Sequence, residues 1–207
     1  PESDWRPLIT KFGYCIGFLI VILGRQQLFT ENTLTPILHL LNRKDGETFW
    51  KVVRLWSTVL GANLAGALVF ALLMHAMGYF QVDLGMEMAA LGGKVYQAGF
   101  IATLLSGLFA GWLIALMVWL LPVAETGRVT IIIIVTYVVG LGSFSHIIAG
   151  SVSAFYVLLC GNASLTAFFT TFLVPTLFGN IVGGVAFVAA INHGQVDPGH
   201  DQAEDQG

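Results

Sequence analysis

The chain has 207 residues, of which 56% are hydrophobic and 10% are charged, and its formal net charge is −3 at pH 7. Because soluble domains carry about 25% charged residues, this composition excludes a soluble globular domain and indicates an integral membrane protein. Nothing in the charge suggests nucleic acid. Cys15 and Cys160 match no metal or disulfide spacing, so we interpret both as small hydrophobic residues and expect no cofactor and no metal.

Long apolar runs of about 20 residues predict an all-α membrane protein rather than the short alternating strands of a β-barrel. We expect a single transmembrane channel domain over residues 1–191 and a polar tail over residues 192–207. Between the second and third spans, a loop with a short amphipathic piece around Met86 is expected. Five spans are predicted in chain order, at about residues 8–41, 49–79, 96–121, 129–160 and 165–191.

Polar residues interrupt the first and the fourth of these spans. The interruptions are Gly24-Arg25-Gln26-Gln27 and residues 140–146. In hydrocarbon an unsatisfied backbone group costs several kcal/mol, so irregular backbone at this depth must line a cavity or be buried in protein. A pair of Gly-interrupted spans in corresponding halves of a chain indicates a transport site.

An internal repeat relates the two halves. Asn63-x-x-Gly66-x-x-x-Phe70 matches a second copy of the pattern 117 residues later, and the same offset carries residues 24–30 onto residues 141–147. The second copy consists of Asn180, Gly183 and Phe187. An odd number of crossings separates the halves, so they would insert in opposite directions, and a helix ahead of residue 1 would complete a three-plus-three inverted repeat. Chance similarity between apolar helices is the alternative.

The distribution of basic residues predicts the orientation in the membrane. Five lie in the loops after the first and third spans, which we therefore place in the cytoplasm, and three lie on the opposite side. The first group is Arg43, Lys44, Lys51, Arg54 and Arg128, and the second is Arg6, Lys11 and Lys94.

Ionisable residues within membrane spans are functional candidates by default. His146 lies in the second interruption, and its imidazole can exchange protons with a weak acid; the alternative is a neutral histidine that donates to a freed carbonyl. Arg25 and Glu31 bracket the first interruption, where they either pair or bind a solute. Thr30 either offers its hydroxyl to a solute or bonds to its own helix, and Lys94 either attracts anions or is an interfacial lysine.

Small residues spaced four apart mark two faces for close helix packing, one with Gly179 and Gly183 and one with Ala62 and Gly66. Asn63 and Asn180 belong to the same two faces. These residues are expected to serve assembly rather than chemistry.

Two strings resemble signatures of the formate/nitrite transporter family, and the resemblance covers essentially the whole chain. The string from Gly24 to Asn32 is similar to the family's broken second helix, and the string from Val174 to Gly184 is similar to its last-helix Pro-x-x-x-Gly-Asn-x-x-Gly-Gly pattern. The Gln-Gln-Leu-Phe-Thr-Glu-Asn version resembles a divergent, YfdC-like branch. The resemblance implies a homopentamer of aquaporin-like six-helix protomers in a bacterial inner membrane, each with its own pore.

The resemblance also implies roles for individual residues. His146 would face Thr30 between two apolar constrictions, Leu28 and Phe29 would match the apolar residues before the threonine, and Lys94 would attract anions at the periplasmic vestibule. The chain departs from the family pattern around the central histidine, where Phe144 is followed by serine, and in the first interruption. The departing residues there are Arg25, Glu31, Ser145 and Gly150, and Gly111 departs separately, where the family's fourth helix usually has an asparagine.

These patterns predict a channel or proton-linked transporter for small monovalent anions of weak acids, such as formate or nitrite. A bare anion crossing apolar constrictions faces a large desolvation cost, which protonation near His146 would remove. The alternatives are a pore for neutral solutes, with Arg25 as a cation barrier, and a non-conducting scaffold sealed by pairing of Arg25 with Glu31. An enzyme is not expected.

Overall fold

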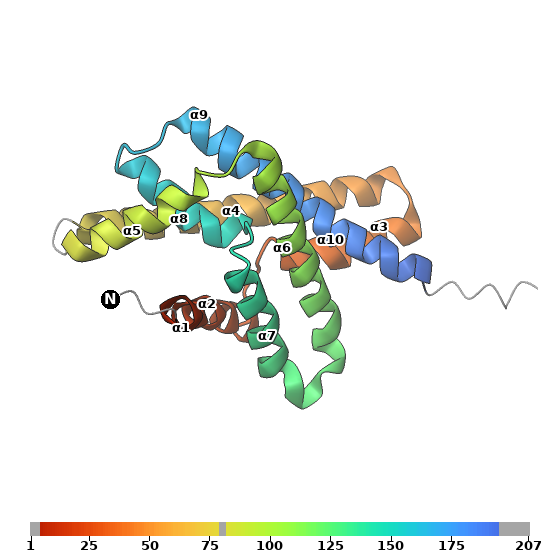
Figure 1. The fold of residues 1–207 in the computed structure, drawn as a ribbon. Helices are drawn as coiled ribbons and strands as arrows, with labels where there is room; N and C mark the ends of the chain where they lie inside the picture. The colour runs from red at the N-terminus through yellow and green to blue at the C-terminus, as the bar shows by residue number, and fades with distance from the viewer. Residues whose placement is uncertain (1–4, 79–81, 195–207) are drawn as a thin grey trace, which may run out of the picture.

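The computed structural model describes residues 5–78 and 82–194, and all regular structure within these residues is helical (Figure 1). The elements are α1 Arg6–Thr10, α2 Phe12–Leu23, η1 Glu31–Thr33, α3 Leu34–Arg43, α4 Gly46–Gly78, α5 Val82–Val95, α6 Phe100–Leu120, η2 Leu121–Val123, η3 Glu125–Gly127, α7 Arg128–Leu141, α8 Ile147–Leu159, α9 Leu165–Ala167, the π-helix η4 Phe168–Leu173 and α10 Val174–Gly194.

Among the described residues, three continuous helical stretches are long and apolar enough to cross a membrane: α4, Phe100–Val123 with α6, and Leu165–Phe187 with the larger part of α10. The remaining apolar helices are shorter because the chain leaves helical geometry inside two spans, between α2 and α3 and between α7 and α8. Both predicted broken helices are thereby confirmed. Of the predicted polar tail, α10 continues through Gly194, and residues 195–207 lie outside the described part of the chain.

The expected loop before the third span was wrong, because residues 82–95 form the helix α5. Its glycines suggested a loop, but they serve close packing against α8. A Cβ on Gly92 would lie 2.6 Å from the Ser153 carbonyl oxygen, and one on Gly85 would lie 3.3 Å from the Tyr156 hydroxyl. Tertiary packing therefore decides the structure of this segment against local propensity.

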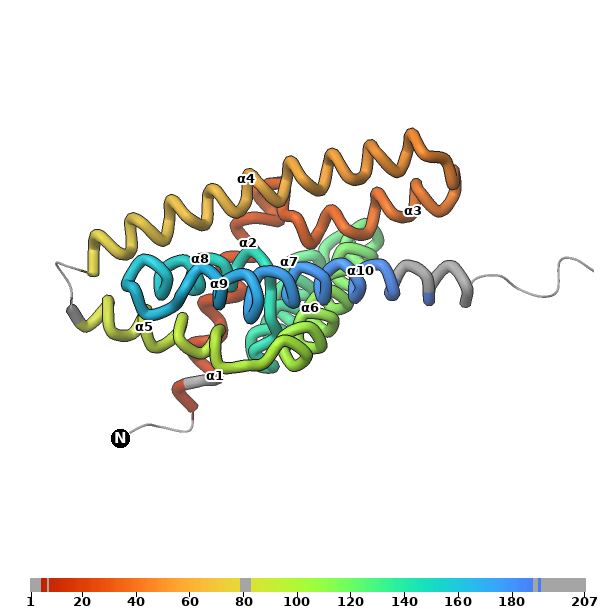
Figure 2. Tube along the Cα trace, turned by 90° about the horizontal axis from the view of Figure 1, so that it is seen from above, coloured from red at the N-terminus to blue at the C-terminus, as the bar shows by residue number. Residues whose placement is uncertain are grey.

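The α3–α4 connection is a sharp turn outside the apolar spans. Lys44 takes a left-handed conformation with φ 50°, and the Asp45 carboxylate accepts hydrogen bonds from the backbone N–H and the hydroxyl of Thr48 at 2.7 and 2.9 Å. The backbone hydrogen bond from Thr48 is the main reason why the pKa of Asp45 lies below its ordinary value. Figure 2 shows α3 folded back beside the first part of α4.

The last span contains a π-helical turn, η4, directly before Pro175. Proline has no N–H to donate to the preceding turn, so the ladder shifts to wider spacing there. Thr170 and Thr171 donate their hydroxyls to carbonyls four residues earlier, at 2.9 and 2.7 Å. These hydroxyls of η4 therefore bond to carbonyls of Thr166 and Ala167 in α9, the turn before it.

The closest helix pair is α6 with α10, and glycines line its contact. A Cβ on Gly107 would lie 3.1 Å from the Thr176 carbonyl oxygen, and Cβ atoms on Gly179 and Gly183 would collide with the Leu104 and Leu108 carbonyl oxygens. Gly66, the repeat partner of Gly183, has nothing within 4 Å of its added Cβ in the described residues. The two faces of the repeat are thus in different environments.

Gly183→Ala should lower the free energy of unfolding by about 1–3 kcal/mol, because the added methyl must push α10 away from α6. The midpoint of thermal unfolding in detergent measures the effect. Gly127→Ala is the matched control, because Gly127 has φ −85° and open space around its added Cβ. Equal midpoints for the two variants would contradict the close contact of α6 with α10.

Candidate functional site

Both broken helices end in the same backbone geometry. At the end of α2, Gly24 N–H bonds to the Ile20 carbonyl and Arg25 turns left-handed with φ 53°. At the end of α7, Gly142 N–H bonds to the Val138 carbonyl and Ser143 turns left-handed with φ 50°. The breaks are therefore equivalent at an offset of 118 residues, one more than the 117 that relates α4 to α10.

Two asparagines satisfy the backbone that the breaks expose. Asn63 of α4 accepts the Phe29 N–H at 2.9 Å and donates to the Gln27 carbonyl at 3.0 Å. Asn180 of α10 accepts the Ile147 N–H at 2.9 Å and donates to the Ser145 and Gly107 carbonyls at 2.9 and 2.8 Å. Each carboxamide thus replaces hydrogen bonds that a continuous helix would have made.

The extended segments of the breaks bring Thr30 and His146 together in the interior. Thr30 Oγ1 lies 2.8 Å from His146 Nε2, and the two residues are 1% and 2% exposed. The ring of Phe18 on α2 meets the His146 ring edge-on at a centroid distance of 5.2 Å. Thr30 and His146, which the family resemblance places opposite each other, therefore form one buried polar contact.

The hydrogen bonds of His146 assign its tautomer. His146 caps the start of α8, where its Nδ1 accepts the N–H groups of Ile148 and Ala149 at 3.3 and 3.2 Å. An accepting Nδ1 carries no hydrogen, so the neutral imidazole has its hydrogen on Nε2 and donates it to Thr30 Oγ1. The alternative in which His146 donates to a freed carbonyl is not what the structure shows.

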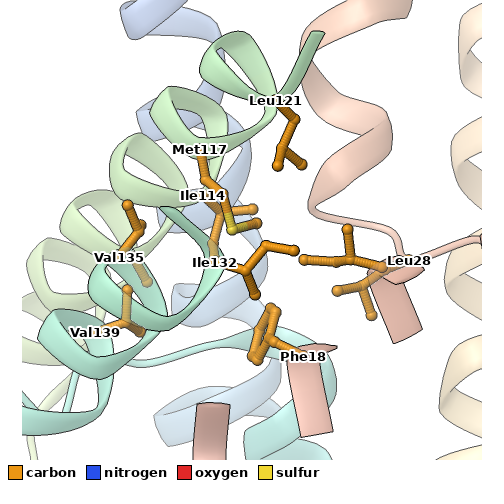
Figure 3. Close-up of a cluster of buried hydrophobic side chains, with 10 residues drawn as sticks. Phe18, Leu28, Ile114, Met117, Leu121, Ile132, Val135 and Val139 are labelled. Carbon is orange, nitrogen blue, oxygen red and sulfur yellow. The ribbon is translucent and has the colours of Figure 1, made fainter. Parts of the chain in front are cut away.

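A largely apolar cavity of about 510 Å³ adjoins this pair. Its wall is formed by one face of α2, by Leu28 at the first break, by Phe70 of α4 and by the start of α8. The lining residues are Gly13, Tyr14, Gly17, Phe18, Val21, Leu28, Phe70, His146, Ile148 and Ala149. Next to it, side chains of α2, α6 and α7 converge with Leu28 in a buried cluster (Figure 3). A bare anion entering such surroundings would lose its hydration with little compensation.

The other predicted site residues occupy different surroundings. Phe29 is buried against Trp56, with ring centroids 6.1 Å apart, and Phe144 stacks on Phe109 at 5.6 Å. Phe29 is therefore buried, whereas Phe144 is half-buried against Phe109, which is itself 50% exposed, and neither Phe29 nor Phe144 lines the cavity.

The charged candidates remain at the edges of the site. Arg25 is exposed, Glu31 is half-buried with one carboxylate oxygen lacking a partner, and no ion pair joins them among the described residues. Lys94 is exposed in the last turn of α5.

Several residues of the site were not predicted from the sequence. Tyr14 and Phe18 line the cavity, and Ser106 accepts the Ser145 N–H at 2.9 Å. Tyr14 and Phe18 lie four residues apart, as do Gly13 and Gly17, so the periodicity of α2 marks one helix face. Periodicity alone does not distinguish a face towards a cavity from one towards lipid.

The fold and the site define a helical membrane protein in which an inverted repeat brings two broken helices together at a buried histidine and threonine. Residues 2–194 match the model of the formate/nitrite transporter family, and the chain belongs to this family. It is 35% identical over 189 residues to the inner membrane protein YfdC of Escherichia coli, covering 91% of this chain and 61% of that protein.

More distant relatives carry the same resemblance. The formate channel BtFdhC of Bacillus thuringiensis is 27% identical over 198 residues, which cover 91% of this chain and 73% of that protein. A solved pentameric formate channel with formate bound superimposes with a TM-score of 0.77 at 24% identity, covering 90% of this chain and 82% of that one. This structural likeness establishes the fold.

Asn180→Ala should reduce thermal stability more than Asn63→Ala. Asn180 is fully buried and serves three backbone groups, so its removal costs about 1–3 kcal/mol for each group left without a partner. Asn63 is half-buried and serves two, one of them at an exposed position. Unfolding midpoints in detergent give the comparison, and a smaller loss for Asn180→Ala would contradict the tethering role.

Proposed function

We propose that the protein is a channel or proton-linked transporter for small monovalent anions of weak acids, of the formate or nitrite type. The observation that carries the proposal is the hydrogen-bonded Thr30–His146 pair beside a largely apolar cavity. Family membership supports it, and two relatives are named formate channels. We place the protein in a bacterial inner membrane as a homopentamer, on the names of YfdC and the solved channel.

The site favours the neutral acid over its anion. A charged carboxylate in the cavity would meet mainly apolar side chains, whereas the acid needs only a few hydrogen bonds. The Thr30 hydroxyl donates to an oxygen of the solute, while the Nε2–H of His146 fixes the orientation of that hydroxyl. The anion gains its proton from water next to His146 and loses it on the far side, so one proton accompanies each anion.

Replacing the central pair should remove this flux. Thr30→Val keeps the shape but removes the donor, and we expect formate uptake to fall about tenfold or more, whereas Thr30→Ser should retain most of it. His146→Phe should abolish pH-dependent uptake. Initial rates into liposomes containing purified protein provide the measurement, and unchanged formate, nitrite and acetate fluxes in Thr30→Val and His146→Phe would overturn the proposal.

The pH dependence separates anion transport from the alternatives. Formate flux should rise as the outer pH falls from about 8 to about 5, because each translocated anion takes up a proton. A pore for neutral solutes would instead conduct glycerol or urea equally at every pH without competition from formate. A non-conducting scaffold would show no flux of either kind, and the absence of an Arg25–Glu31 ion pair removes the contact proposed to seal it.

A further inference from the structure

A half-buried lysine contacts the second break. Lys11, between α1 and α2, places its Nζ 3.4 Å from Ser143 Oγ, and its aliphatic stem packs over Gly140 at the end of α7. A Cβ on Gly140 would lie 3.6 Å from Lys11 Cδ and 3.7 Å from Tyr14 Cβ. The lysine head group is therefore held at the left-handed residue of the break, three residues before His146.

No carboxylate neutralises this lysine within residues 5–78 and 82–194. The nearest basic neighbour along the chain, Arg6, pairs with Glu87 at 3.4 Å, and the other ion pair found there joins Lys51 to Glu47. Lys11 Nζ is instead beside a hydroxyl, so the cluster offers donors and a full positive charge. Such a set suits an anion and not a cation.

A second donor, which has no hydrogen-bond partner, lies one turn further along α2. The hydroxyl of Tyr14 is buried and has no hydrogen-bond partner among the described residues. An unsatisfied buried hydroxyl costs about 1–3 kcal/mol, so a ligand that accepts its hydrogen is favoured there. Tyr14 also lines the cavity beside His146.

Aromatic contacts along α2 connect the donor Tyr14 to His146 of the central pair. The rings of Tyr14 and Phe18 lie 5.0 Å apart, and Phe18 lies 5.2 Å from His146. Seven residues of helix separate Lys11 from Phe18, which corresponds to roughly 10 Å along α2. Lys11, Tyr14 and Phe18 are spaced three and four residues apart, so they lie on one face of α2 that connects the lysine to His146.

The first break has a cation at the equivalent position. Arg25 occupies the left-handed site that Ser143 occupies in the second break, and it is exposed and forms no ion pair in the described chain. In the first break the left-handed residue, Arg25, is itself the cation. In the second break the left-handed residue is Ser143, and the cation that contacts it is Lys11. The pseudo-twofold repeat thus presents one unneutralised cation at each break.

We propose that Lys11, Ser143 and Tyr14 form a binding site for a small carboxylate or nitrite-like anion, which holds the anion before it reaches Thr30 and His146. This inference rests on the proposed transport of weak-acid anions. From the sequence alone Lys11 bears only on the membrane orientation, and Lys94 is the residue expected to attract anions. Lys11 and Tyr14 are binding residues, because they contact the anion and do not exchange its proton.

Formate uptake into liposomes, measured against formate concentration, tests the site. Lys11→Met keeps the stem on Gly140 but removes the charge, and it should raise the half-saturating concentration about tenfold with little change in the maximal rate. Lys11→Arg should restore the wild-type value. Tyr14→Phe should raise the half-saturating concentration about threefold, and it tests the site independently should Lys11→Met not fold.

A control variant and the pattern of results across the other variants distinguish the possible outcomes. Lys51→Gln removes an exposed lysine that pairs with Glu47, and it should leave the curve unchanged. Wild-type half-saturation in both Lys11→Met and Tyr14→Phe would overturn the site while His146→Phe still abolished flux. A rise in Lys94→Gln alone would assign anion attraction to Lys94 instead. If the wild-type protein carried no weak-acid anion at all, the proposed function itself would fail.

Discussion

The structure depends on satisfying backbone groups at two places where a membrane helix is interrupted. Each unsatisfied N–H or carbonyl in hydrocarbon costs several kcal/mol, so a break is stable only when side chains take over the missing bonds. Asn63 and Asn180 do so from the helices that follow each break. The bonds at Asn180 also require α6 within reach, which the glycine contacts of α10 permit. Helix packing and the central site are therefore parts of the same arrangement.

That arrangement determines the chemistry of the histidine. Because α8 begins at Ile147, its first N–H groups lack partners within the helix, and His146 Nδ1 accepts two of them. The two accepted bonds leave Nδ1 without a hydrogen, so the cap directs the Nε2–H of the imidazole to Thr30. Within this pair His146 is consequently the donor, and the hydroxyl oxygen of Thr30 is the acceptor.

The sequence predicted the membrane class and the two breaks, because the length of the apolar segments and their Gly-rich interruptions are direct consequences of crossing a membrane. The meeting of Thr30 with His146 was expected only from the resemblance to the family. The sequence did not predict α5, whose glycines serve contacts with α8. Nor did it find Tyr14 or Lys11. Their role depends on which face of α2 turns towards the second break, and that face is set by packing against α7 and not by local pattern.

The charged groups and the uncharged polar groups of the site lie in different parts of the structure. Unneutralised cations lie at the left-handed residues of the breaks, where Arg25 and Ser143 are exposed, whereas the interior has a hydroxyl and an imidazole amid apolar side chains. A cation raises the local concentration of anions over several ångströms, yet it would hold an anion too tightly if it lay beside His146. Conduction requires favourable binding at the mouth and weak binding at the centre. In the proposed transport Lys11 meets both requirements, because roughly 10 Å of α2 separate it from Phe18, which contacts His146, and charge attraction extends further than a hydrogen bond.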